Sequence, residues 1–257
     1  MEESTNIKVL DRALLLIEEL DKGPRGVNEL AKVCGLNPAS TFRILKTLLA
    51  HGFVWQGEDE KYSIGTRLSY VSSSHSFLSE LCETAYYRMK KLSETEQEAM
   101  NLVVRDYDRC YIICQSRTGK IVDYVPPVGT YLPFHASACG KILLAGLDET
   151  TRDRILDSID YKKLTDSTIT SREEFVSGLC KAREQGFAID AHESQAEGFC
   201  VAVPVRDKKG GTIAALSFSG FIGRRTVDEV DHYVKLLKAA SAEITDELFG
   251  KETKIES

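Results

Sequence analysis

Residues 27–61 read VNELAKVCGLNPASTFRILKTLLAHGFVWQGEDEK and predict two helices joined by a tight turn, followed by a short β-hairpin. The first helix is indicated by apolar residues on one face, at Val27, Leu30, Ala31 and Cys34. Gly35 supplies the left-handed backbone that ends this helix, and we expect Leu36 to fill the space between the helices. Pro38 suits the first turn of the second helix, because its missing N–H would have no partner there. This order is typical of a helix-turn-helix with a β-wing, a module that binds DNA.

The second helix, which we expect to run to about His51, presents residues suited to the major groove. Its periodicity places an apolar face toward the core, made by Phe42, Leu45, Leu48 and Leu49. The opposite face holds Ser40, Arg43, Ile44 and Thr47, with Asn37 and Lys46 at its margins. Any surface helix has a polar face, but the hairpin and the preceding helix favour DNA binding. We therefore predict that Ser40, Arg43 and Thr47 lie near base edges, and that Arg25, Lys46 and Lys61 contact phosphates or the minor groove.

The charge of the chain restricts how it can bind DNA. The 257 residues carry a net charge of −6, which is unusual for a DNA-binding protein. Residues 1–68 are nearly neutral, with 9 basic and 10 acidic side chains, and the remainder carries the rest of the negative charge. We therefore expect binding to depend on a local basic stripe that is doubled by dimerisation, and not on the field of the whole protein.

Composition favours a cytoplasmic protein with reduced thiols. The seven cysteines, at positions 34, 82, 110, 114, 139, 180 and 200, include no C-x-x-C pair, and the acidic start of the chain does not resemble a targeting sequence. No apolar run approaches the 18 residues that would suggest a membrane span. We predict a cytoplasmic location, no membrane association and no cofactor.

Helical patterns flank the DNA-binding segment. Before it, residues 6–21 predict a helix with a buried stripe formed by Ile7, Leu10, Leu14, Ile17 and Leu20. After it, residues 65–74 and 77–92 predict two helices with no intervening coil, so we expect a stiff connection. The domain boundaries that we predict are a winged helix-turn-helix at 1–66, a helical linker at 67–92, a second domain at 93–250 and a tail at 251–257.

The second half of the chain predicts an α+β domain with an antiparallel sheet flanked by helices. Strand patterns occur at residues 100–105, 110–115, 121–125, 131–134, 187–190, 199–205 and 212–219. Helices are expected at 137–145, at 149–159, at 172–185, opened by a capping box at Ser171 and closed by Gly186, and at 226–248. Runs of strands and helices in this order indicate an α+β domain.

No common enzymatic motif is present, but several polar residues lie in apolar surroundings. The chain has no G-x-S-x-G, P-loop, G-x-G-x-x-G or H-E-x-x-H sequence. The predicted helix at 137–145 begins with small residues, which leaves its first N–H groups accessible to a carboxylate. Asp190, Cys200, Ser217 and Ser219 lie in or beside strands, where a buried polar group needs a partner. A ligand pocket and simple core packing both remain possible explanations.

Two rival functions use the same residues. A metal sensor would draw on Cys139, Cys200, His135, Asp190 and His192, and an enzyme on the first four of these, although their spacing is not diagnostic of either. A third alternative is a DNA-binding protein whose C-terminal domain only dimerises. Each rival predicts a different observation: bound metal, catalytic turnover, or the absence of any ligand.

Together these segments resemble the IclR family of transcriptional regulators, over about residues 6–250. The resemblance is carried by the stretch from Gly35 to Val54, by LPFHASACGK at 132–141, by QGFAID at 185–190, and by GFCVAVPV at 198–205 leading to AALSFSG at 214–220. It implies a winged helix-turn-helix, a linker helix and a GAF-like effector domain that binds a small organic molecule, often a carboxylic or aromatic acid. It also implies homodimers that pair into tetramers, bound to double-stranded operator DNA.

The resemblance assigns the effector pocket to positions that the residue chemistry also indicates. They are Ala138, Cys139, Asp190, Cys200, Ser217 and Ser219, with no catalytic or metal-binding residue among them. This chain departs from the family at Pro38-Ala39, where a polar residue is common, so Ala39 is expected to offer DNA only a methyl contact. It also has Phe199 where relatives often carry Arg, which argues against a strongly anionic ligand. We predict a ligand-responsive regulator whose connecting helices transmit the signal.

Overall fold

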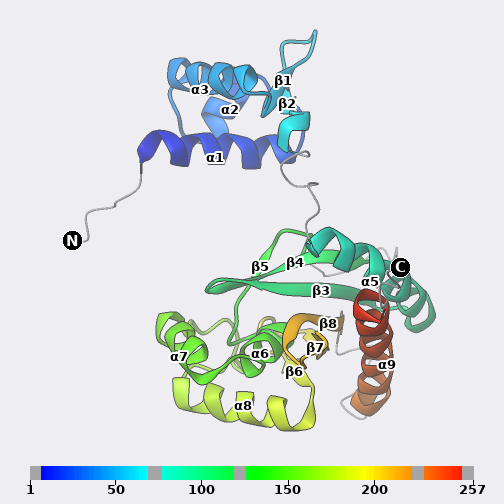
Figure 1. Cartoon of the computed structure of the whole chain (residues 1–257). Helices are drawn as coiled ribbons and strands as arrows, with labels where there is room; N and C mark the ends of the chain where they lie inside the picture. The colour runs from blue at the N-terminus through cyan, green and yellow to red at the C-terminus, as the bar shows by residue number, and fades with distance from the viewer. Residues whose placement is uncertain (1–6, 69–76, 119–125, 222–228, 251–257) are drawn as a thin grey trace, which may run out of the picture. The chain divides into compact units, whose positions relative to one another are not determined.

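The computed structural model describes residues 7–68, 77–118, 126–221 and 229–250 (Figure 1). The chain divides into two compact units, residues 1–76 and 77–257, and each is described by itself. Most of the helix predicted at 65–74, the strand predicted at 121–125, the start of the helix predicted at 226 and the tail at 251–257 lie outside the described residues. In fold class the molecule is a helix-turn-helix unit followed by an α+β unit, as predicted.

The first unit contains three helices and a two-stranded wing. They are α1 (Lys8–Asp21), α2 (Val27–Val33), α3 (Pro38–Ala50), β1 (Val54–Gln56) and β2 (Tyr62–Ile64). Gly35 has a φ of +64°, and the Leu36 N–H donates to the carbonyl of Ala31 at 2.8 Å, which closes α2. The Asn37 side chain caps α3 by accepting from the Ala39 N–H at 2.9 Å. The predicted turn chemistry of the helix-turn-helix is therefore confirmed.

The buried face of α1 differs from the prediction. Leu16 and Leu20 are buried, whereas Ile7, Leu10 and Leu14 are 66%, 55% and 51% exposed. The helix has two apolar stripes, and the periodicity alone cannot distinguish the stripe that packs on α3 from the one that remains uncovered in a single chain. The predicted stripe was therefore wrong in its N-terminal half.

The buried face of α3 also differs from the prediction, by a rotation about the helix axis. Ile44 is 8% exposed and packs in the core with Leu45, whereas Phe42 is 45% exposed. Both residues flank Leu45, so either fits an apolar stripe centred on that residue. Ile44 belongs to the core cluster of the unit, whereas the Phe42 ring is met by the Lys46 ammonium, 5.4 Å from its centroid. Ile44 therefore does not belong to the outward face.

The second unit is built on an antiparallel sheet with the order β5-β4-β3-β8-β7-β6 among the described strands. The strands are β3 (Ala99–Asp106), β4 (Arg109–Ser116), β5 (Tyr131–Leu132), β6 (Ala188–Ala191), β7 (Gly198–Arg206) and β8 (Thr212–Phe221). A bulge in the β3–β4 pairing, at Leu102/Val103, changes which β4 residues share a face. The strands beyond residue 126 agree with the predicted positions.

Helices cover both faces of this sheet (Figure 1). One face packs against α5 (Phe77–Glu96) and α9 (Val230–Phe249), with Leu81, Ala85 and Met89 of α5 fully buried. The other face packs against α6 (Ala138–Ala145), α7 (Glu149–Ser158) and α8 (Arg172–Gln185). Strand residues therefore alternate between two cores, and α5, which the sequence assigned to the linker, packs on the sheet. No described helix is long and apolar enough to cross a membrane.

Candidate functional site

The outward side of α3 carries the residues that the sequence assigned to base edges. Arg43, Lys46 and Thr47 are exposed and Ser40 is partly buried. All four line one shallow groove, which is completed by Val9, Arg12, Phe42 and Ile44. The Thr47 hydroxyl donates to the carbonyl of Arg43 at 3.0 Å, so its lone pairs face outward. Arg12, on α1, adds a cation to this groove that the sequence analysis did not identify.

Arg25 and Lys61 lie beside the wing rather than beside α3. Arg25 pairs with Tyr62 through two backbone hydrogen bonds, which places it next to Lys61. Each cation has an acidic neighbour: Arg25 lies 3.8 Å from Glu19, and Lys61 lies 4.0 Å from Asp59. The Lys61–Asp59 pair is exposed and screened by solvent, which leaves Lys61 available to phosphates. The Arg25 side chain is only 32% exposed, beside a Glu19 side chain that is mostly buried.

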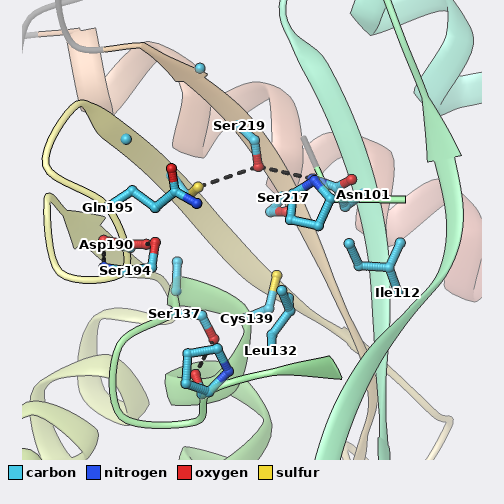
Figure 2. Close-up of a pocket in the computed structure, with 16 residues that line it drawn as sticks. Asn101, Ile112, Leu132, Ser137, Cys139, Asp190, Ser194, Gln195, Ser217 and Ser219 are labelled. Atoms are coloured by element: carbon cyan, nitrogen blue, oxygen red, sulfur yellow. Dashed lines mark hydrogen bonds between the residues drawn. The ribbon is translucent and has the colours of Figure 1, made fainter. Parts of the chain in front are cut away.

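A cavity opens in the second unit between α6 and the sheet (Figure 2). It encloses about 80 Å³, measured as space for the centre of a water molecule. All six positions predicted for the effector line it: Ala138, Cys139, Asp190, Cys200, Ser217 and Ser219. The fold brings them together because β7 and β8 are neighbours, β6 pairs with β7, and α6 packs across these strands.

The N-terminus of α6 forms one wall of the cavity. Ser137 caps the helix, because its hydroxyl oxygen accepts from the Gly140 N–H at 3.1 Å. In the described part of the chain, the N–H groups of Ala138 and Cys139 have no hydrogen-bond partner, as is usual in the first turn of a helix. Ser137 and Cys139 lie at the end of the cavity opposite Ser219 (Figure 2). This wall offers two N–H donors and the positive end of a helix dipole.

Asp190 lines the cavity, but its oxygens are occupied by the loop that follows β6. One oxygen accepts from the backbone N–H groups of Glu193 and Ser194 at 2.8 and 3.3 Å, and the other accepts from the Ser194 hydroxyl at 2.5 Å. Burial raises the pKa of the Asp190 carboxyl, and these hydrogen bonds and Lys141 act in the opposite direction. Asp190 thus holds Ser194 and the adjacent Gln195 against the cavity.

A buried ion pair fixes the same loop to α6. The Lys141 ammonium donates to Glu193 at 2.5 Å and to the carbonyl of Ile189 at 2.8 Å. Both side chains are nearly inaccessible, and burial raises the pKa of Glu193 although Lys141 opposes that shift. Because removing one partner of a buried pair is costly, this pair ties the loop firmly to the cavity helix.

Burial dominates the electrostatics of the two cavity thiols, and both have a raised pKa. Burial raises the pKa of Cys139 to about 12, although the neighbouring Ser217 hydroxyl lowers it. Burial and the nearby Asp190 carboxylate likewise raise the pKa of Cys200. Neither thiol has the depressed pKa of a catalytic nucleophile, so both act as small, weakly polar wall groups.

The structure does not assemble the residues of the metal-sensor alternative. Across residues 7–68, 77–118, 126–221 and 229–250, no group of three or more His, Cys, Asp or Glu side chains is placed to hold a metal ion. The His135 ring bonds to the carbonyl of Lys162 at 3.1 Å, and the His192 ring bonds to the carbonyl of Ala196 at 2.6 Å. Neither histidine lines the cavity.

Phe199 does not bear on the charge of a ligand. It is 5% exposed and packs in the core beneath α5 and α9, on the face of the sheet opposite the cavity. Its neighbours Gly198 and Cys200 line the cavity because side chains alternate along β7. The inference drawn from Phe199 against an anionic ligand was therefore wrong.

Several cavity residues were missed by the sequence analysis. Asn101 of β3, Ile112 of β4 and the loop residues Ser194 and Gln195 all line the cavity. Asn101 had a detectable signal, because it is a polar residue inside the apolar run from Met100 to Val104. The loop residues had none, since their position depends on the turn that Asp190 organises.

Comparison with known proteins matches both units to domains of the same protein family. Residues 9–58 match the model of the IclR helix-turn-helix domain, and residues 76–246 match that of the bacterial transcriptional regulator IclR C-terminal domain. The HTH-type transcriptional regulator KdgR of Escherichia coli K12 is 32% identical over 225 residues, covering 87% of this chain and 85% of KdgR. The transcriptional repressor IclR of the same strain is 30% identical, covering 93% and 89%.

Solved structures share the architecture. The IclR protein of Thermotoga maritima matches with a TM-score of 0.75 at 24% identity, covering 95% of this chain and 99% of that one. An IclR homologue from Microbacterium hydrocarbonoxydans, complexed with 4-hydroxybenzoate, matches with a TM-score of 0.79 at 23% identity, covering 93% and 98%. The C-terminal domain of Escherichia coli KdgR, at 32% identity, covers 66% of this chain and 98% of that domain with a TM-score of 0.60.

Proposed function

This chain belongs to the IclR family of bacterial transcriptional regulators, and for that reason we propose that it works as a homodimer that reads a pseudo-palindromic operator under the control of a small carboxylic acid. It has a helix-turn-helix DNA-binding domain and a ligand-binding C-terminal domain, and its family consists of regulators, not enzymes. We place DNA reading in residues 1–66, the connecting helices in 67–92 and effector binding in 93–250, with the protein acting in the cytoplasm.

The observation that supports effector binding is the convergence of hydrogen-bond donors on one cavity. Ala138, Cys139 and Ser219 line the same space, and two backbone N–H groups and one hydroxyl among them can donate to a carboxylate or carbonyl oxygen. The two thiols, the polar side chains of Asn101, Asp190 and Ser217, and several apolar side chains complete the walls. Such a site favours a compact acid held mainly by neutral donors.

The size of the cavity favours a short acid over an aromatic one. An apolar cavity of about 150 Å³ admits benzene, and this cavity is near 80 Å³. An acid of a few carbons fits without rearrangement. An aromatic acid, such as the 4-hydroxybenzoate bound by the Microbacterium homologue, would require the walls to separate.

Signal transmission is proposed to run through β3. Asn101 faces the cavity, whereas its neighbours Met100 and Leu102 face the opposite core, where α5 contributes Leu81 and Met89. A ligand that moves β3 would therefore change the packing of α5, the first described helix of the second unit. The ligand shifts the equilibrium between two arrangements of β3 and α5 only to the extent that it binds one of them more tightly than the other.

Short acids are expected to raise the melting temperature of the second unit. At a concentration of 100 times Kd, binding adds about 2.7 kcal/mol, which corresponds to a rise of roughly 5–10 °C for a unit of this size. Thermal-shift measurements with pyruvate, succinate and 4-hydroxybenzoate test this. Ala138→Leu, which fills the cavity, should melt cooperatively but show no shift. If no acid shifts the wild type, the sensor proposal is refuted.

A further inference from the structure

The structure assigns Asn101 a role in effector specificity that rests on the function proposed above: it makes Ser219 a hydrogen-bond donor toward the cavity. Asn101 is 4% exposed, lies on β3 and lines the cavity with Ser219 of β8. A hydroxyl group has one proton and two acceptor lone pairs, and its neighbours determine which of them a ligand meets. The contacts of Ser219 decide this question.

Both lone pairs of Ser219 are occupied by protein donors. The Asn101 Nδ2 group donates to the Ser219 Oγ at 2.9 Å, and the Cys200 thiol donates to the same oxygen at 3.3 Å (Figure 2). Within the described ranges, no acceptor is paired with the Ser219 proton, so that proton is available to a molecule in the cavity.

The direction of the Asn101 amide is set by Gln115, which does not line the cavity. Arg117 can only donate, and its Nε donates to the Gln115 Oε1 at 2.5 Å. The Gln115 amide nitrogen must therefore be the end that donates to Asn101 Oδ1 and to the carbonyl of Pro126, both at 2.8 Å. A carbonyl oxygen can only accept, so Arg117 and Pro126 fix Gln115 independently. Asn101 is left with its nitrogen facing Ser219.

This chain of hydrogen bonds has a consequence for ligand chemistry. With Ser219 presenting a proton at one end and the N–H groups of Ala138 and Cys139 at the other, the cavity accepts a molecule with acceptor oxygens at both ends. A carboxylate with a second carbonyl or carboxylate oxygen meets this requirement. An ammonium or amide N–H placed against Ser219 would leave two donors facing each other, which costs affinity. Asn101 is thus a positioning residue, since it acts through Ser219.

Asn101→Asp tests the assignment because it keeps the shape of the side chain and replaces the NH2 donor that faces Ser219 with an acceptor oxygen. The new carboxylate still accepts from Gln115, but it also accepts the Ser219 proton and withdraws it from the cavity. Calorimetric titration of the full-length protein with pyruvate, succinate and 4-hydroxybenzoate should show at least about a tenfold loss of affinity for every probe that binds the wild type. Ser219→Ala should weaken binding to a similar degree.

The double variant Asn101→Asp/Ser219→Ala separates the proposed loss of the Ser219 donor from simple charge repulsion between Asp and the acid. Repulsion between the introduced carboxylate and an acid does not need the Ser219 hydroxyl, whereas the proposed effect does. Asn101→Asp should therefore cost much less affinity in the Ser219→Ala background than in the wild type. Equal losses in both backgrounds overturn the assignment. Failure of all three probes to bind the wild type instead refutes the proposed effector site as a whole.

Gln115→Leu provides a second route if Asn101→Asp does not fold. Gln115 does not line the cavity, and its loss frees the Asn101 amide to turn its oxygen toward Ser219. We expect a loss of about threefold or more with Ser219 present and none in the Ser219→Ala background. An unchanged affinity in the folded Gln115→Leu protein contradicts the proposed orientation.

Discussion

Replacing Leu10 and Leu14 together with Glu is expected to convert the protein from a dimer to a monomer and to lower operator affinity by about 10²- to 10⁴-fold. With Ile7, these residues form an apolar stripe on α1 that remains more than half exposed in the single chain. Exposed apolar stripes of this kind mark partner surfaces. A second copy of the chain is the partner that a pseudo-palindromic operator requires, because each recognition helix reads one half-site. The large loss follows from removing the second half-site from the binding event.

The double substitution should leave the fold intact, since both positions are exposed and Glu is a good helix former. Sedimentation velocity measures the mass, and a gel shift with an operator selected from random duplexes measures affinity. Leu164→Glu is the matched control: Leu164 is 42% exposed in the second unit, and the change should affect neither result. A double variant that still sediments as a dimer would show that this stripe is not the interface.

Arg43→Ala is expected to cost about 1–3 kcal/mol of operator affinity, roughly 5- to 150-fold, and to relax the preference for one base pair in each half-site. Arg43 is exposed on the outward side of α3, and its guanidinium can bond to two acceptors of a guanine at once. The relaxed preference should appear at the matching position of both half-sites, because the proposed dimer presents two such helices.

Lys46→Ala, on the same helix, is expected to affect DNA binding in a different way from Arg43→Ala. Lys46 lies near Gln56 of the wing and Phe42, at the margin of the reading face, so we assign it to a phosphate. Its loss should weaken all sequences alike and reduce the salt dependence of binding by about one unit of slope. Comparison of both variants on operator and scrambled DNA at fixed salt decides the matter. If Arg43→Ala keeps the wild-type sequence preference, Arg43 does not read a base.

The sequence predicted the elements well because local chemistry determines them. Gly35, Asn37 and Pro38 specify the turn and the start of α3, and Ser171 and Gly186 begin and end α8 as expected. Four of the six cavity positions stand out as polar residues in or beside apolar strands, and Ala138 and Cys139 as small residues at the start of a helix; the family resemblance assigned the full set. These signals do not depend on which elements pack together.

The burial of individual side chains, by contrast, depends on tertiary packing, which local sequence patterns do not determine. Ile44 and Phe42 both fit an apolar stripe centred on Leu45, and only the packing of the unit distinguishes the buried Ile44 from the exposed Phe42. Phe199 appeared relevant to the ligand because it lies between two cavity residues, but strand alternation turns it to the other core. The prediction for Asp190 was incomplete for the same reason. Asp190 lines the cavity, but its carboxylate also accepts hydrogen bonds from the loop that carries Ser194.

The account depends most on the coupling between the cavity and DNA binding. The direct measurement is the operator affinity of the full-length protein at fixed salt, with and without saturating pyruvate or whichever of succinate and 4-hydroxybenzoate raises the melting temperature. We predict that the acid changes operator affinity by about 5- to 150-fold in the wild type and leaves it unchanged in Ala138→Leu, which should bind the operator like the wild type without acid. An acid that binds the cavity but does not change operator affinity, or that changes it equally in Ala138→Leu, would contradict the account.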